Sequence, residues 1–254
     1  MSLPLVLLLA TASKPVVLVT GAAGRTGSLV YKQLVPSGKS IVRALVHGNV
    51  TTARAALGCT ACDESEGIFF GDVTNMSSLT APFSGVDMVA IAIGLSGSTP
   101  TAVMQAVEWK GVEAQVEALV TGTIGAFPLL RKVVLCSSMG TTNANPPPFE
   151  GGKDLFWKLQ AEAFLATSGV PSTVIKPGGL TDGPGHAPLL VGHDDSLLTE
   201  GHFEIDRADV ARVMVAALFH KSAQLRIDLA ASKTGTPTTD LAALLDSAVW
   251  PWQK

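Results

Sequence analysis

Short apolar runs alternate along the chain with longer segments in which apolar residues recur at helical spacing. The first run, Val16–Thr20, is rich in β-branched residues, which is typical of a strand buried on both faces of a parallel sheet. Similar runs predict strands at Ile41–Val46, Ile68–Gly71, Val86–Ile93, Lys132–Cys136 and Ser172–Lys176. Helical spacing predicts helices at Thr26–Val35, Thr52–Leu57, Ala102–Val120, Lys153–Ser168 and Asp206–Phe219, and Leu225–Leu229 and Leu241–Val249 close the chain.

This alternation predicts an α/β fold: a doubly wound parallel sheet with helices on both faces, because βαβ units pack most simply in that way. We expect a single domain over residues 1–254, with an N-terminal extension at 1–14. At 177–205 the pattern gives way to Gly, Pro, His and Asp, which predicts an irregular lid or small substrate lobe. Asp206 is then expected to cap the helix that follows. Ligands of such a sheet bind beyond the carboxyl ends of its strands.

A glycine-rich turn separates the first predicted strand from the first predicted helix. Its residues are Gly21, Ala22, Ala23, Gly24, Arg25, Thr26 and Gly27, with the glycines three positions apart. Small residues let the backbone approach a pyrophosphate, whose charge the amino end of a helix stabilises. The strand and helix around the turn are the context that a Rossmann-like dinucleotide site requires. The alternative is a turn needed only for tight packing of the strand against the helix.

The residues after the second strand favour NADP over NAD. Enzymes that prefer NAD usually carry an acid about 20 residues beyond the last glycine, where it binds the ribose 2′-hydroxyl. That position is His47 here, and 40–49 contain no acid, whereas Arg25 and Arg43 are available cations. Arg43 as a solvated strand residue and His47 as a simple turn residue are the alternatives. Residues that end the third and fourth strands complete the expected cofactor site: Asp72, at an adenine edge or as a plain loop acid, with Val73, Ile93 and Gly94.

Six short motifs occur in order along the chain. They are Thr20–Gly27, Gly71–Thr74, Ser137–Gly140, Trp157–Glu162, Pro177–Leu180 and Arg207–Ala211. Together they resemble the atypical short-chain dehydrogenases/reductases, in particular plant-type NAD(P)-binding proteins related to the NmrA-like group, over nearly all of Pro15–Leu245. The resemblance implies an NADP cofactor, hydroxyl groups of Ser137 and Ser138 near the nicotinamide, and a lining of its ring by Pro177, Gly178, Gly179 and Leu180. Turn capping is the alternative role of the two serines.

The proton chemistry of the wider family uses a Tyr-x-x-x-Lys pair, and the resemblance matches its lysine to Lys158. Four residues earlier stands Asp154, and the one tyrosine of the chain, Tyr31, lies on the first predicted helix. The expected pair is therefore broken, since an ionised carboxylate does not replace a phenol without a strong shift of its pKa. Lys158 and Ser138 remain the catalytic candidates. An exposed ion pair of Lys158 with Asp154 or Glu162 is the alternative.

Two further positions depart from the family pattern. Lys176 stands where relatives often have arginine, and Ala114 where they commonly have asparagine on the central helix. Both departures weaken the case for the usual carbonyl-reductase proton relay.

Charge and cysteine usage exclude several other classes of protein. The 254 residues carry 18 basic against 21 acidic side chains, without a basic run, so no nucleic-acid partner is expected. Three cysteines suit a reducing compartment better than a disulfide scaffold, and no metal site is expected at Cys59 and Cys62, which have no second pair. Polar surface is expected at His186, His193, Asp194 and Asp195, and an exposed docking tail at Trp250–Trp252.

The apolar run Leu3–Ala10 lacks a basic segment before it and is far shorter than the roughly 20 residues that cross a bilayer. No transmembrane segment is expected, and the location is cytoplasmic or the plastid stroma. Two functions stay open. The first is an NADP(H)-dependent oxidoreductase that transfers hydride to a small organic acceptor such as a quinone, flavin or activated double bond. The second is a non-catalytic NADP-binding redox sensor or assembly subunit. A protein partner or a second copy of the chain fits either function.

Overall fold

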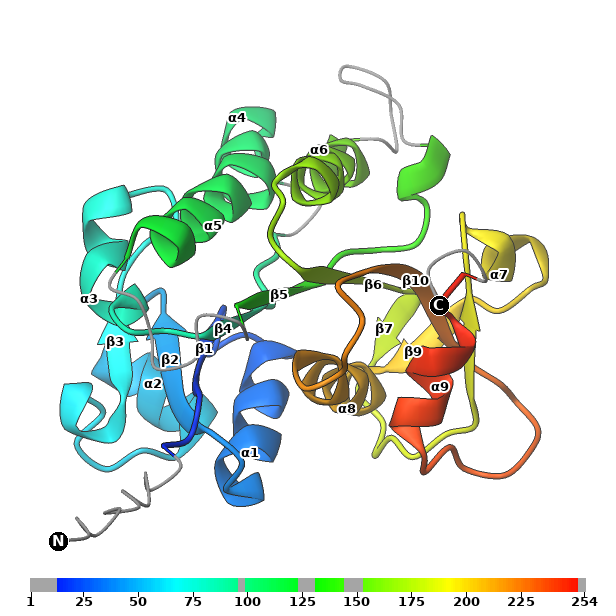
Figure 1. The fold of residues 1–254 in the computed structure, drawn as a ribbon, viewed down its shortest axis with the longest axis horizontal. Coiled ribbons are helices and arrows are strands. Elements are labelled where there is room, and N and C mark those ends of the chain that lie inside the picture. Colours follow the sequence, from blue (N-terminus) through cyan, green and yellow to red (C-terminus); the bar gives the residue numbers. More distant parts are fainter. Residues whose placement is uncertain (1–12, 96–98, 123–130, 144–152, 251–254) are drawn as a thin grey trace, which may run out of the picture.

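A mostly parallel, eight-stranded sheet forms the centre of the protein (Figure 1). The computed structural model describes residues 13–95, 99–122, 131–143 and 153–250. The strands lie in the order β3-β2-β1-β4-β5-β6-β10-β8, of which only β8 runs antiparallel to its neighbour. Their bounds are β1 Val16–Thr20, β2 Ile41–Val46, β3 Ile68–Phe70, β4 Met88–Ile91, β5 Lys132–Cys136, β6 Ser172–Pro177, β8 Leu189–Gly192 and β10 Gln224–Ala231. The predicted doubly wound α/β fold is confirmed.

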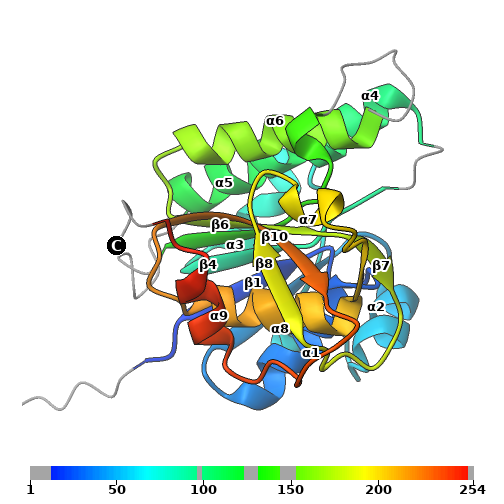
Figure 2. The same ribbon diagram turned by 90° about the vertical axis from the view of Figure 1, so that its right-hand side faces the viewer.

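Helices cover both faces of this sheet, and Figure 2 shows the two layers edge on. One layer holds α3 Thr80–Phe83, α4 Thr101–Met104, α5 Gly111–Thr121 and α6 Lys153–Thr167. The other layer holds α1 Gly27–Ser37, α2 Val50–Leu57, α8 Arg207–Leu218 and α9 Leu241–Ser247. An apolar cluster fills each of the two spaces between sheet and helices, which is why β4 and β5 are buried along their whole length.

The predicted helix over Ala102–Val120 is continuous but changes its winding. Between α4 and α5, Gln105–Lys110 (η3) form a π-helical segment. A π-segment inserts an extra residue into a helix and is frequent at functional sites. The buried residue of this segment is Glu108.

The region 177–205 is more regular than the sequence indicates. It contains β7 Gly179–Thr181, the edge strand β8, α7 Ser196–Thr199 and the start of β9 Glu204–Asp206, and β7 pairs with β9. The expectation of an irregular stretch is therefore corrected. Short strands of this kind are hard to see in a sequence, since their hydrogen-bond partners are distant in the chain.

Asp206 occupies the position before α8, yet its side chain makes no capping bond. Its carboxylate instead accepts hydrogen bonds from the Thr181 hydroxyl and from the amides of Gly183 and Gly185. These bonds lower the pKa of Asp206. The expectation that Asp206 caps α8 is therefore corrected. Its carboxylate instead holds the turn after β7 against the start of α8.

Three other expectations are also corrected. Cys59 and Cys62 form a disulfide, whereas the composition favoured free thiols. Asp195 is buried rather than part of a polar surface, and Trp250 is half-buried against the His193 ring, with centroids 4.1 Å apart. Residues 251 and 252 of the expected tail, and the apolar run Leu3–Ala10, lie outside the described residues. Among the described residues, no helix combines the length and apolar composition needed to cross a bilayer.

Candidate functional site

The strand order reverses direction between β1 and β4, and the glycine turn lies at this point. An added Cβ on Gly21 would overlap the carbonyl oxygen of Ala92 beyond β4, and one on Gly27 would overlap the carbonyl oxygen of Gly21. Gly21 also has a φ of +65°, which side-chain-bearing residues rarely adopt. The two glycines thus let the turn pack tightly against the residues after β4, at the point of the sheet where a dinucleotide binds in such folds.

One half of a long groove opens beside the glycine turn and has a volume of about 670 Å³. Most of its lining is apolar, as an adenosine would require. Of the predicted residues it contains Gly21, Ala23, Gly24, His47, Asp72, Val73, Ile93 and Gly94. Two residues of the predicted glycine turn do not line the groove: Ala22 is buried in the core, and Gly27 is buried against the backbone of Gly21.

His47 and Asp72 face each other in this half, with 3.8 Å between the imidazole Nε2 and a carboxylate oxygen. Asp72 also accepts hydrogen bonds from the amide and hydroxyl of Thr74, and these hold the pKa of the Asp72 carboxyl below its ordinary value. Arg43, expected at the same place, lies elsewhere. Its guanidinium donates to the carbonyls of Pro82 and Ser84. Arg43 is thus not brought to the groove.

The other half has a volume of about 620 Å³ and shares Gly24 and Ala92–Leu95 with the first, so the two form one continuous groove. The structure brings together here the residues that the family resemblance assigned to the nicotinamide. They are Ser137, Ser138, Lys158, Pro177, Gly178, Gly179 and Leu180, with Thr26 from the glycine turn. Arg25, expected near the 2′-phosphate of the adenosine ribose, lines this half and not the adenosine half. We call the two parts the adenosine half and the nicotinamide half.

Lys158 is held by an acid that the sequence did not indicate. Its ammonium lies 2.7 Å from a carboxylate oxygen of Glu108, and the other oxygen of Glu108 accepts the Leu95 amide at 2.9 Å. The alternative of an exposed pair with Asp154 or Glu162 is wrong, because Lys158 is largely buried and its partner is on another helix. Burial alone lowers the pKa of Lys158, but the charge and hydrogen bond of Glu108 outweigh it and raise that pKa.

The hydroxyl groups of the site are already engaged. Ser137 donates a very short hydrogen bond to Glu162, and Ser138 donates to the carbonyl of Met139. Tyr31 lies near Glu66, which precedes β3 and so marks the amino-terminal edge of the sheet, and burial and this acid raise the pKa of the phenol. The phenol of this chain is therefore at the opposite edge from the groove.

Asp182 joins the glycine turn to the start of α8. One carboxylate oxygen of Asp182 lies 2.6 Å from a guanidinium nitrogen of Arg207, and the other lies 3.6 Å from a guanidinium nitrogen of Arg25. Arg207 also lines the nicotinamide half, although sequence reasoning gave it no role. In the sequence, only the Arg207–Ala211 motif points to Arg207 as a site residue. Its ion pair with Asp182, 25 positions away, leaves no periodic pattern.

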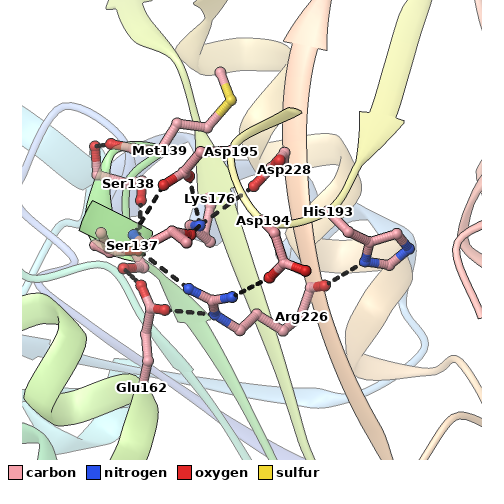
Figure 3. Close-up of polar contacts among 12 residues, drawn as sticks. Ser137, Ser138, Met139, Glu162, Lys176, His193, Asp194, Asp195, Arg226 and Asp228 are labelled. Carbon is pink, nitrogen blue, oxygen red and sulfur yellow. Dashed lines mark hydrogen bonds and ion pairs between the residues drawn. The ribbon is translucent and has the colours of Figure 1, made fainter. Parts of the chain in front are cut away.

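A polar cluster lies under the nicotinamide half, between β6, β10 and the loop before α7 (Figure 3). Lys176 is completely buried and pairs with Asp195 at 2.5 Å and Asp228 at 3.3 Å. Next to it, Arg226 pairs with Glu162 at 2.6 Å and with Asp194 at 3.1 Å. Asp195 also accepts the Thr142 amide. The cluster thereby ties the loop before α7 to the sheet, and Leu198 of α7 lines the groove.

Fold and groove together define a Rossmann-type dinucleotide-binding protein. Residues 21–221 match the model of a family described as NAD(P)H-binding, and the chain belongs to this family. The predicted family and the NAD(P)-binding oxidoreductase type are confirmed. Membership of the family leaves both NAD and NADP open as the nucleotide.

Two related proteins and one solved structure are similar to the chain over most of its length. An uncharacterised chloroplastic protein of Arabidopsis thaliana is 36% identical, with 92% of this chain and 76% of that protein covered. The sanguinarine reductase of Eschscholzia californica is 30% identical over 95% of this chain and 99% of its own. The structure of a putative NAD-dependent epimerase/dehydratase from Bacillus halodurans is 20% identical, with a TM-score of 0.68 over 92% of this chain and 99% of that one.

Proposed function

We propose that the protein is an NADPH-dependent reductase that delivers hydride to a small organic acceptor, such as a quinone, a flavin or an activated double bond. The observation that carries the proposal is the charged Lys158, which lines the nicotinamide half of the groove. When bound, NADPH supplies the hydride. Gly21 and Gly24 line the groove where the pyrophosphate binds, the adenosine half receives the adenosine, and Lys158 orients the second ribose.

The placement of Tyr31 supports acceptors of this kind. A simple ketone needs a proton donor for its alkoxide, and the phenol lies at the opposite edge of the sheet. A quinone or enone spreads the negative charge and takes its proton from solvent, so orientation and one cation suffice. The relative named a sanguinarine reductase supports the assignment of a reductase activity.

Turnover tests this function directly. Purified protein is expected to oxidise NADPH in the presence of at least one member of a panel of quinones, flavins and enones. Lys158→Ala is expected to lower kcat/KM by about 100-fold, since it removes a charged hydrogen bond at the reacting end. The measurement is NADPH absorbance, with Lys32→Ala, an exposed lysine on α1, as the control. Binding of NADPH without consumption across the whole panel contradicts the proposal.

The preference for NADPH is a further part of the proposal. His47 in the adenosine half and the absence of an acid in 40–49 support it. Isothermal titration is expected to give tighter binding of NADPH than of NADH. His47→Ala is expected to weaken NADPH about 5-fold, because an exposed contact to phosphate contributes roughly 1 kcal/mol, and to leave NADH unchanged. Tighter binding of NADH to the unaltered protein contradicts the preference.

A non-catalytic NADP-binding sensor or assembly subunit remains the second candidate. The hydroxyls of Ser137 and Ser138 favour it, because both donate to the protein itself. A plastid location fits both candidates and is supported by the chloroplastic name of the Arabidopsis relative. The partner is a small molecule in the first candidate, and a protein or a second copy of the chain in the second.

A further inference from the structure

Glu108 and Lys158 form an ion pair, but only one of the two side chains is accessible from the groove. The Glu108 side chain is 2% exposed and that of Lys158 is 15% exposed, and of the two only Lys158 lines the nicotinamide half. Both carboxylate oxygens of Glu108 are occupied, one by the Leu95 amide and one by the ammonium. A molecule in the groove therefore meets the cation and not its counterion.

Two adjacent contacts fix this arrangement. Trp109, next to Glu108, stacks on Trp157, next to Lys158, with ring centroids 5.6 Å apart and planes inclined by 9°. Glu108 belongs to the π-helical segment Gln105–Lys110 and is its buried residue. The segment therefore has a packing contact and an ion pair to α6, one residue apart, and these hold the lysine in register with the groove.

The charge state of Lys158 depends on three groups. Glu108 faces it from the π-helical segment, Cys136 from β5 and Asp154 from its own helix. The Cys136 thiol is fully buried, and burial raises its pKa to about 11, so it carries no charge near neutral pH. Glu108 is the one of the three with a direct hydrogen bond to the ammonium. Removing its charge leaves a buried ammonium whose desolvation is no longer offset.

We propose that Glu108 is a positioning residue that keeps Lys158 charged and aims its two remaining N–H groups into the nicotinamide half, where they stabilise negative charge in place of a phenol. An ammonium has three donors, and Glu108 takes one. One of the others serves the cofactor ribose and one serves the acceptor. The acceptor class that fits is neutral and bears a carbonyl oxygen that becomes anionic on reduction, such as a quinone or enone. This inference rests on the proposed reductase function.

The test is the pH dependence of NADPH binding by Glu108→Gln, measured from pH 6 to 10 by quenching of protein fluorescence. The unaltered protein is expected to bind with nearly constant affinity to about pH 9.5, since Lys158 stays charged. In Glu108→Gln the pKa of Lys158 is expected to fall, because burial then acts without the opposing carboxylate, so that binding weakens by about 5-fold or more between pH 7 and 9.5. Glu113→Gln, which alters a partly exposed acid that pairs with Lys110, is the matched control and should follow the unaltered protein.

The double variant Glu108→Gln/Lys158→Arg separates charge from folding. Arginine keeps its charge throughout this range, so the double variant is expected to bind NADPH with a flat pH profile again. A Glu108→Gln profile that matches the unaltered protein, or a double variant that stays pH-dependent, overturns the inference. Where the profile shifts as expected but no acceptor is reduced, the positioning role stands and the reductase function fails. Where a quinone is reduced but the profile does not shift, the reductase function stands and the positioning role fails.

Discussion

Lys176→Met is expected to destabilise the protein by about 3 to 5 kcal/mol at pH 7.5, because it leaves two carboxylates buried without their cation. Asp228 is completely buried, and Asp195 nearly so. The methionine matches the lysine in length, so loss of volume contributes little. The same cluster holds the loop before α7, whose Leu198 lines the nicotinamide half, so NADPH binding should weaken as well. Chemical denaturation with and without NADPH measures both effects.

The effect should depend on pH in a definite direction. Burial already raises the pKa of Asp228 although Lys176 opposes it. Without the lysine, the folded state holds protons on these carboxyls that the unfolded state has released. The folded state then binds more protons, so its stability falls as pH rises above the ordinary Asp value. The loss caused by Lys176→Met is therefore expected to be smaller at pH 5 than at pH 8.

Lys132→Met is the matched control for this variant. Lys132 is also buried, but it donates to the carbonyls of His220 and Ser222 and burial lowers its pKa to about 8. Its loss strands no carboxylate, so a cost of about 1 to 2 kcal/mol without the acid dependence is expected. Equal costs for the two variants, or a Lys176→Met cost that does not change with pH, would show that Asp195 and Asp228 are not stabilised by Lys176.

Gly21→Ala is expected to abolish measurable NADPH binding, a loss of at least about 100-fold, and to cost about 3 kcal/mol or more of stability. The alanine methyl group would overlap the carbonyl oxygen of Ala92 and would require a positive φ. The positive φ alone costs about 1 to 2 kcal/mol. The overlap adds to this, and it displaces the turn from the end of β4, which forms the floor of the groove. Isothermal titration and thermal unfolding check the two effects.

Gly58→Ala isolates the backbone contribution. Gly58 ends α2 with a φ of +74°, close to that of Gly21, but an added Cβ meets no atom within 4 Å. We expect a cost of about 1 kcal/mol and unchanged NADPH affinity. If Gly21→Ala resembles Gly58→Ala in both measurements, close packing of the turn against β4 is not what makes the groove competent for a dinucleotide.

Most of the fold follows from local patterns that the sequence carries by itself. β2 and β5 begin and end at the predicted residues, because each is a short apolar run bounded by polar or turn residues. The glycine turn is equally recognisable in the sequence, since its spacing reflects the lack of room for a Cβ at Gly21 and Gly27. The family motif predicts Lys158 as a site residue, and the structure places it in the groove.

The tertiary structure alone decided which charges meet. Glu108 and Lys158 are 50 positions apart, and Lys176 reaches Asp228 from a neighbouring strand, so neither pair leaves a periodic trace. Arg43 shows the converse: its strand was predicted correctly, but its side chain turns to the carbonyls of Pro82 and Ser84. The periodicity of apolar residues along the chain predicts which positions are buried, because each element turns one set of positions toward the core. The partner of a buried charge depends on how the completed sheet brings distant segments together, and that is settled only by the packed fold.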